Sequence, residues 1–165
     1  MEKEQKVIVL IDSNAIIHRS YHALPKTMST SKGELTNVVY VYTTTLLKVL
    51  EDLKPDYIAA SFDISRATFR MEAYSEYKAT RIKADQELYD QIPKVRELLA
   101  ALNIPIYELE GFEADDCIGT MSDKFEDNNP KQIYKGFKVY IVTGDKDTFQ
   151  LVDDNIVIYL SLIHI

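Results

Sequence analysis

The chain has 165 residues, of which 46% are hydrophobic and 27% are charged, as in globular domains that bury a core of their own. Its one cysteine, Cys117, excludes an internal disulfide and a cysteine-cluster metal site, and a reducing compartment is therefore expected. No apolar run approaches the roughly 20 residues that span a bilayer, so the expected localisation is cytoplasmic, with no membrane partner.

The net charge of −7 argues against a nucleic-acid partner, because domains that bind nucleic acids are usually basic. The acids are unevenly distributed, however. Seven of them lie in the clusters GFEADD and TGDKD or directly after apolar runs: Asp12, Asp63, Glu113, Asp115, Asp116, Asp145 and Asp147. Of the 26 acids, the remaining 19 balance the 19 bases. If the seven hold cations, a phosphate-containing substrate is compatible with the sequence.

The first half of the chain predicts two strands separated by a helix. Residues 7–11 form a short, β-branched apolar run, which predicts a strand buried on both faces that ends at Asp12. Apolar residues then recur at helical spacing, which predicts a helix over 36–54. Residues 57–62 predict a second strand, and this strand also leads to an aspartate, Asp63.

Residues 64–85 change character, because they are polar, basic and aromatic with no clean period. We expect a loop with helical pieces. Its cations and aromatic rings are interleaved, at Arg70, Tyr74, Tyr77, Lys78 and Arg81. Cations contact phosphates, and aromatic rings stack on unpaired bases. On its own this composition indicates a solvated surface segment, but its place directly after Asp63 favours contact with a nucleic acid.

The second half continues the alternation. Helical spacing returns over 86–102, where Pro93 should kink the helix or mark its first turn. Beyond it we predict three strands and two helices, with strands at 106–109, 137–142 and 156–159 and helices beginning at Glu113 and Asp147. Strands and helices alternate throughout, which predicts an α/β fold with helices flanking a mostly parallel central sheet.

Three of the strands are followed by an acid, namely Asp12, Asp63 and Asp145. The carboxyl ends of parallel strands share one edge of a sheet, and ligands bind there, so these side chains should converge. Each aspartate alone is also typical of a helix N-cap, and acids in a first helical turn suit the helix dipole. Their joint placement favours a metal site instead.

The type of ligand indicates the metal. Carboxylates without a matching set of Cys or His favour Mg²⁺ or Mn²⁺. In a regular helix Glu113 and Asp115 point about 160° apart, which favours two ions or an irregular helix start.

Seven motifs occur in order over nearly the whole chain: IDSNAIIHRSYHALP, STSKGELTNVVY, FDISRATFR, YSEYKATR, QIP, GFEADDCIGT and VTGDKDTFQLV. They resemble the 5′→3′ exonuclease domain of bacterial DNA polymerase I and its stand-alone relatives, in the flap endonuclease superfamily, which is built on a PIN-like sheet. The resemblance implies metal-dependent cleavage of DNA phosphodiesters near a 5′ end or flap junction, as in primer removal during replication and in repair.

The resemblance also implies roles for single residues. The seven acids would bind two Mg²⁺ or Mn²⁺ ions. Residues of about 64–85 would form a helical arch through which the 5′ strand passes, with Lys78 and Arg81 as catalytic cations at the phosphate. The residues implied in DNA binding are Arg19, Lys32, Arg70, Tyr77, Lys78 and Arg81.

The same resemblance sets an expectation for domain organisation. Residues 1–165 would be the N-terminal PIN-like portion of the exonuclease. In the family a further acid pair and a helix-hairpin-helix DNA-binding element normally follow the fifth strand, and neither occurs in this chain. A polymerase domain in the full-length chain is an expected partner.

Two other functions remain open. A PIN-type ribonuclease would share the acidic edge, and a non-catalytic nucleic-acid-binding fragment would keep the basic segment. The length of that segment and the specificity of the motifs favour DNA over RNA, so a structure-specific 5′ nuclease is the leading hypothesis.

Overall fold

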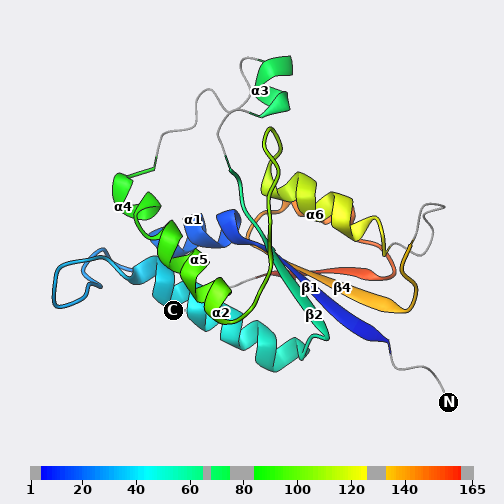
Figure 1. The fold of residues 1–165 in the computed structure, drawn as a ribbon, viewed down its shortest axis with the longest axis horizontal. Helices are drawn as coiled ribbons and strands as arrows, with labels where there is room; N and C mark the ends of the chain where they lie inside the picture. Colours follow the sequence, from blue (N-terminus) through cyan, green and yellow to red (C-terminus); the bar gives the residue numbers. More distant parts are fainter. Residues whose placement is uncertain (1–4, 65–67, 75–83, 126–132, 161–165) are drawn as a thin grey trace.

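The computed structural model describes residues 5–64, 68–74, 84–125 and 133–160. At its centre lies a five-stranded sheet in the order β3-β2-β1-β4-β5, and every pair of neighbouring strands is parallel (Figure 1). The strands are β1 (Lys6–Asp12), β2 (Tyr57–Ser61), β3 (Ile106–Tyr107), β4 (Phe137–Thr143) and β5 (Ile156–Leu160). The predicted α/β fold is therefore confirmed.

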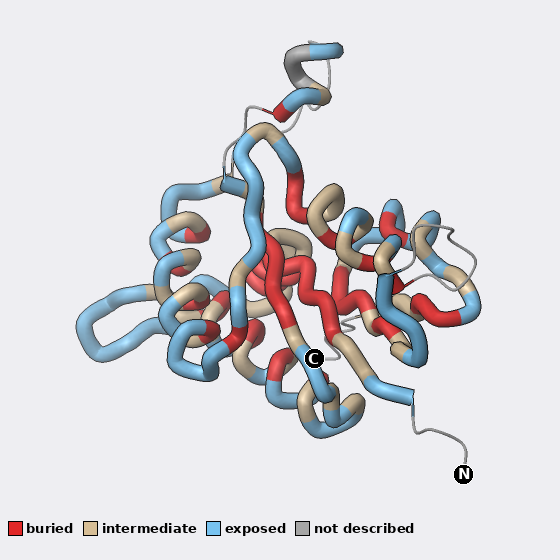
Figure 2. The backbone as a smooth tube through the Cα atoms, turned by 45° about the vertical axis from the view of Figure 1, so that its right-hand side comes forward, coloured by how far each residue is buried: buried red, intermediate tan, exposed pale blue. Residues whose placement is uncertain are grey.

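Helices cover both faces of the sheet. One face packs against α1 (Ser13–Ala23), α2 (Asn37–Leu53), α4 (Gln86–Tyr89) and α5 (Ile92–Ala101), and the other against α6 (Ala114–Ser122) and the 3₁₀ helix η1 (Asp147–Leu151). Successive residues of β1 alternate between the two cores: Val9 and Ile11 face the first, and Leu10 faces the second. Figure 2 shows that the buried residues are concentrated in these strands and on the helix faces turned toward them.

Three elements differ from the sequence prediction. Helix α1 was not predicted, although Ile16, Ile17 and Tyr21 are buried at helical spacing after an N-cap. The pattern over 86–102 is two helices, and Pro93 lies in the first turn of the second, where proline is favoured. The third strand is only two residues long, because the chain leaves the sheet after Tyr107.

The strand order places a switch point beside β1. Along the chain, β2 and β3 extend the sheet on one side of β1, whereas β4 and β5 extend it on the other. Asp12 is level with Ser61 of β2, and the preceding Ile11 is level with Val142 of β4. The carboxyl ends of the three central strands therefore meet, as in other α/β folds that bind a ligand at this edge.

Helix α3 (Phe69–Ala73) stands beyond the carboxyl edge, apart from the helical layers (Figure 1). It lies within the segment over 64–85, in which helical pieces were predicted. No helix in the described part of the chain is long and apolar enough to cross a membrane.

Candidate active site

Asp12 is the last residue of β1 and also the N-cap of α1. Only 5% of its surface is exposed. Its Oδ1 accepts the N–H of Ala15 at 3.0 Å, and its Oδ2 accepts the hydroxyl of Thr143, at the end of β4, at 2.8 Å. Burial raises the pKa of Asp12 to about 6; the two hydrogen bonds oppose this shift, and the charges of Asp63 and Asp115 add to it. Asp12 is therefore an N-cap, and the charges of acids from two other segments raise its pKa.

Asp63 connects two helix starts. It lies two residues beyond β2, and its Oδ1 accepts the N–H of Ala114, the first residue of α6, at 2.6 Å. The backbone N–H of Asp63 donates to Oδ1 of Asn14 in α1 at 3.4 Å. The sequence prediction that acids after separate strands share one edge therefore agrees with these contacts.

The start of α6 carries three acids on a tight turn. Glu113 is its N-cap, and Oδ2 of Asp116 accepts the Glu113 N–H at 3.0 Å, as in one half of a capping box. Burial raises the pKa of Asp115, and the charges of Asp116 and Glu113 raise it further. Within the described residues, the buried Oδ1 of Asp115 has no hydrogen-bond partner. A buried oxygen of this kind costs free energy unless something binds it.

Arg70 of α3 reaches into this group of acids. Its Nη1 donates to Oδ2 of Asp116 at 2.6 Å and its Nη2 donates to Oδ1 at 2.5 Å, while Nη1 lies 3.6 Å from Oε2 of Glu113. The hydrogen bonds to Asp116 raise the pKa of Arg70 above its usual value, so the guanidinium stays charged. A cation therefore already lies among these acids.

Asp145 and Asp147 complete the edge. The N–H of Asp145 donates to Oγ1 of Thr143 at 3.0 Å, and Oδ1 of Asp145 accepts the N–H of Asp147 at 2.9 Å. Asp147 begins η1, which faces α6 across a pocket of about 230 Å³. The charged residues that line this pocket are Arg70, Asp115, Asp116, Asp123 and Asp147.

These residues fit a divalent cation by their chemistry. The donors are hard carboxylate oxygens, and one of them is buried without a hydrogen-bond partner among the described residues. The single guanidinium of Arg70 offsets only part of the negative charge of Asp116 and Glu113. In the present arrangement, however, no three Asp, Glu, His or Cys side chains of the described segments are grouped to hold a metal ion. Several of the carboxylates are instead bonded to backbone N–H groups, to Thr143 or to Arg70.

Apart from Arg70, the residues predicted to bind DNA fall into three groups. The side chain of Arg19 runs beside the Thr143–Gly144–Asp145 turn, so closely that a Cβ added to Gly144 would lie 3.3 Å from Arg19 Cδ. Lys32 lies on an exposed turn over 24–36, and the structure does not bring it to the acids. Tyr77, Lys78 and Arg81 lie outside the described residues, so their predicted roles stay predictions.

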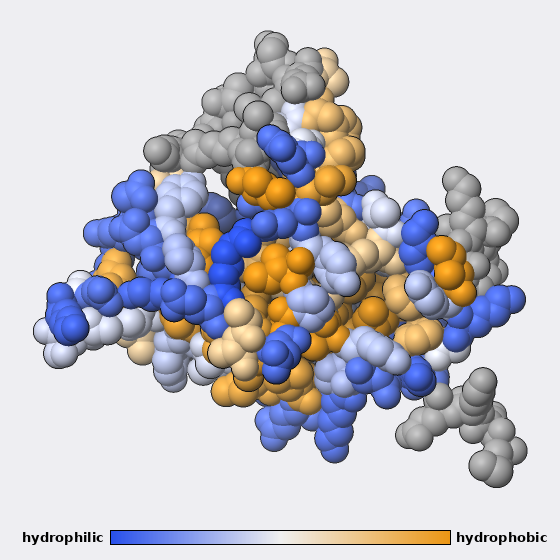
Figure 3. All heavy atoms as spheres, in the orientation of Figure 1, coloured by the Kyte–Doolittle hydropathy of each residue, from blue (hydrophilic) through white to orange (hydrophobic). Residues whose placement is uncertain are grey.

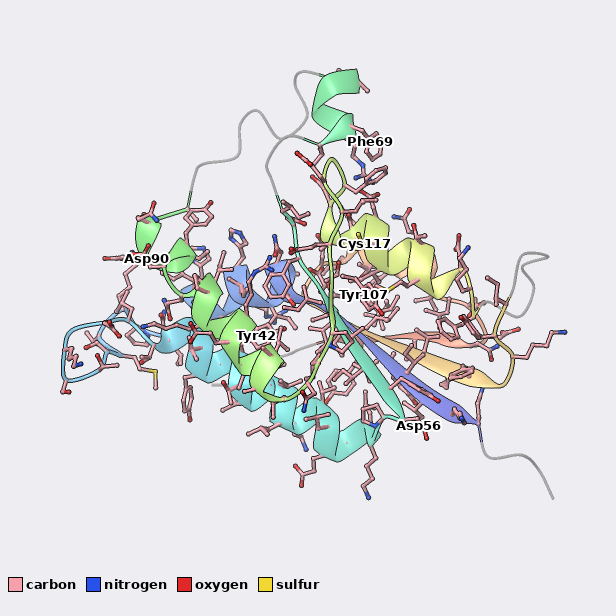
Figure 4. The ribbon with its side chains drawn as sticks, viewed as in Figure 1. Tyr42, Asp56, Phe69, Asp90, Tyr107 and Cys117 are labelled. Carbon is pink, nitrogen blue, oxygen red and sulfur yellow. The ribbon has the colours of Figure 1, made fainter. Side chains whose placement is uncertain are left out.

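Sequence reasoning missed two polar residues that shape the site. Thr143 joins Asp12 to Asp145, and Asn14 accepts the backbone N–H of Asp63. Neither residue is charged, and only their positions at a strand end and a helix start pointed to them. Arg70 was predicted to contact DNA, and its contact with Asp116 was not foreseen. In the view of Figure 4, Phe69 lies at the base of α3, above Cys117 of α6.

Comparison with known proteins gives a consistent result. Residues 7–164 match the family described as 5′-3′ exonuclease, N-terminal resolvase-like domain. The chain is 44% identical over 151 residues to DNA polymerase I of Caldicellulosiruptor bescii and 42% identical over 158 residues to DNA polymerase I of Bacillus subtilis. These alignments cover 92% and 96% of the chain, which spans only 17% of the length of each relative.

Solved structures share the fold at low sequence identity. T5 5′-exonuclease with bound divalent zinc ions has a TM-score of 0.68 and 15% identity, over 94% of this chain and 55% of that one. The catalytic core of Rad2 in complex with a DNA substrate has a TM-score of 0.51 and 17% identity, over 98% of this chain and 45% of that one. What these structures share with the chain is the arrangement of the sheet and its helices.

Proposed function

Because the chain belongs to the 5′-3′ exonuclease N-terminal resolvase-like domain family, we propose that it is the nuclease portion of a structure-specific 5′ nuclease. It would hydrolyse DNA phosphodiesters near a 5′ end or a flap junction, as in primer removal and repair. The observation that carries this proposal is the convergence of Asp12, Asp63 and the α6 acids at the switch point of a parallel sheet.

Divalent cations are part of the proposal. We propose that Asp12, Asp63, Glu113, Asp115, Asp116, Asp145 and Asp147 hold two Mg²⁺ or Mn²⁺ ions. Bound cations of this kind supply an activated water and stabilise charge on the transferring phosphoryl group and on the leaving oxygen. The T5 5′-exonuclease structure with divalent zinc ions supports a metal-dependent activity for this fold.

The chain's own residues would prepare the site. Thr143 and Ala15 fix the orientation of the Asp12 carboxylate, and Ala114 fixes that of Asp63. These side chains would therefore lose less conformational entropy when they bind a cation. Arg19 lies beside Gly144, the residue before Asp145, and its guanidinium would contact a phosphate there. Lys78 and Arg81 would place positive charge at the scissile phosphate, and Lys32, Arg70 and Tyr77 would contact the DNA strand.

The partners proposed are DNA with a 5′ end or a 5′ flap and a polymerase domain in the same full-length chain. The relatives named DNA polymerase I, of which this chain spans 17%, support the second of these. The complex of Rad2 with a DNA substrate supports the first for a protein of this fold.

Cleavage of a labelled 5′-flap duplex tests the proposal, with single-stranded RNA of the same length as the competing substrate. We expect cuts near the flap junction in Mg²⁺ and none in EDTA. Cleavage of the RNA alone would indicate the ribonuclease alternative, and binding of DNA without cleavage in Mg²⁺ would indicate the non-catalytic fragment.

A variant pair assigns the activity to the acidic edge. Asp63→Asn keeps an oxygen for the Ala114 N–H but removes a charge, and we expect cleavage to fall about a hundredfold or more, since bound metal contributes several kcal/mol. Asp56→Asn is the matched control. Asp56 accepts the Val7 N–H. It lies at the end of β2 opposite to Asp63, where Figure 4 labels it, and its variant should retain full activity.

A further inference from the structure

Arg70 is held in the acidic site more tightly than a surface ion pair would be. Its guanidinium binds both carboxylate oxygens of Asp116, and only 30% of its side chain is exposed, against 17% for Asp116 and 9% for Glu113. A forked, partly desolvated pair of this kind is stronger than an exposed one, because water screens it less. Among the residues that line the adjoining pocket, Arg70 is the one base beside four aspartates.

The backbone of α3 is attached at the same place. The N–H of Phe69 donates to the carbonyl of Gly111 at 2.9 Å, and the Phe69 ring lies 5.3 Å from that of Phe112, in the loop before α6. The Arg70 guanidinium lies 4.9 Å from the Phe69 ring centroid. On the face shown in Figure 3, apolar side chains gather where α3 meets this loop. Helix α3 is therefore joined to the carboxyl edge both by Arg70 and by Phe69.

We propose that Arg70 is an internal counterion, which occupies the acidic edge in the metal-free protein and is displaced when a divalent cation binds there. This inference rests on the proposed metal-dependent function. The same Asp116 and Glu113 oxygens cannot bind the guanidinium and a cation of higher charge at full strength together. By thermodynamic linkage, the Arg70–Asp116 pair weakens metal binding by the same factor by which bound metal weakens the Arg70–Asp116 pair.

Displacement would also change the position of α3. Without the fork to Asp116, α3 still has the Phe69–Gly111 hydrogen bond and the ring contact with Phe112 as anchors on this edge. A released Arg70 can pair with a phosphate in place of Asp116, since the guanidinium fork fits both groups. Metal occupancy and the availability of this cation would thus be coupled.

The first test is Mn²⁺ binding by calorimetry to the wild-type chain and to Arg70→Gln. We expect Arg70→Gln to bind Mn²⁺ at least about fivefold more tightly, the lower end of typical coupling between sites. The matched control is Arg96→Gln. Arg96 also pairs with a carboxylate, on Glu108, and lies over the Phe62 ring, with 34% of its side chain exposed. Its Mn²⁺ affinity should be unchanged. Equal or weaker binding by Arg70→Gln would show that Arg70 stays in place, and would overturn the proposal.

Two further measurements separate displacement from a fixed structural role. The loss of melting temperature caused by Arg70→Gln should be larger in EDTA than in saturating Mn²⁺; an equal loss in both would also overturn the proposal. The second measurement uses the wild-type chain and so needs no variant that folds. Without the Arg70 fork, α3 is held less firmly, so hydrogen exchange of the Phe69 amide should become faster in Mg²⁺. Unchanged exchange counts against displacement. If the wild-type chain binds no divalent cation, the proposed function fails as well, whereas ordinary binding with no effect of Arg70→Gln rejects this inference alone.

Discussion

The acids of the site differ in burial and in protein partners, so the same Asp→Asn substitution should have unequal effects at different positions. Asp12 is 5% exposed and its pKa is raised to about 6, mainly by burial. For an acid, a folded-state pKa above the unfolded value means that the folded chain binds more protons between about pH 4 and pH 6. The stability of the metal-free protein should therefore fall as the pH rises through this window.

The first prediction is that Asp12→Asn stabilises the metal-free protein at pH 7.5 but not near pH 4. The amide oxygen can still accept the Ala15 N–H, and the ionisation cost disappears. A shift of about two pKa units corresponds to a gain of up to about 3 kcal/mol. Urea denaturation in EDTA at both pH values measures it. Asp52→Asn is the control: the pKa of Asp52 is lowered by its bond to Lys48, so no gain is expected, and a gain there would contradict this account.

The second prediction is opposite in sign. In Asp116→Asn, the amide NH₂ replaces an oxygen that accepts from Arg70, so one charge-assisted hydrogen bond is lost and the guanidinium is left without its charge partner. We expect the metal-free protein to lose about 1–3 kcal/mol. Asp115→Asn, which removes a buried charge with raised pKa, should be neutral or stabilising in the same urea titration. If the two variants behave alike, the Arg70 fork is absent in solution.

At the scale of elements, the spacing of apolar residues predicted the strands and helices that depend on local sequence. The five strands, α2 and α6 were predicted because their apolar residues repeat at strand or helix spacing and their ends carry turn signals. The acids of the site were predicted because parallel strands share an edge. The Arg70–Asp116 pair was not, because it joins residues 46 positions apart and depends on how α3 packs, which no local pattern records.

A buried glutamine shows how one side chain connects elements. Gln91, in the link between α4 and α5, is 2% exposed. Its Oε1 accepts the N–H of Val38 in the first turn of α2 at 3.0 Å, and its Nε2 donates to Oδ1 of Asn37 at 3.0 Å. Gln91 thereby caps α2 from outside that helix, where its first N–H groups have no intrahelical partner.

The third prediction follows from this cap. Gln91→Met keeps the volume but leaves the buried Val38 N–H without an acceptor, so we expect a loss of about 1–3 kcal/mol. For a chain of this size that lowers the melting temperature by about 2–4 °C per kcal/mol. Gln86→Met, at an exposed position of α4, should stay within about 0.5 kcal/mol of the parent. Equal melting temperatures for the two variants would show that α2 does not need this cap.

At the scale of the whole molecule, charge is unevenly placed. The net charge is −7, and seven acids lie in the segments that meet at the carboxyl edge. Two bound divalent cations would offset four of these seven negative charges and leave the chain less negative overall. The protein should therefore repel nucleic acid most strongly when it is free of metal.

The fourth prediction is that divalent cations strengthen DNA binding. Anisotropy of a labelled 5′ single-stranded DNA should report tighter binding in Ca²⁺, which binds hard oxygen ligands with looser geometry than Mg²⁺, than in EDTA at equal ionic strength. With the cation present, affinity should fall linearly with salt on logarithmic axes as phosphate contacts are lost. Asp63→Asn should reduce the benefit of Ca²⁺, and Asp56→Asn should not. Binding that is insensitive to both salt and Ca²⁺ would contradict the proposed edge.

The position of β1 in the middle of the sheet has a consequence for the order of assembly during synthesis. β1 can pair with β2 as soon as the first 61 residues are available, together with α1 and α2. Its other side waits for β4, and Thr143, which orients Asp12, lies 131 positions later in the chain. Closing so long a loop is a late event in folding. A growing chain therefore carries Asp12 and Asp63 long before Thr143 can orient Asp12, and the acidic edge is complete only when the fourth strand inserts beside the first.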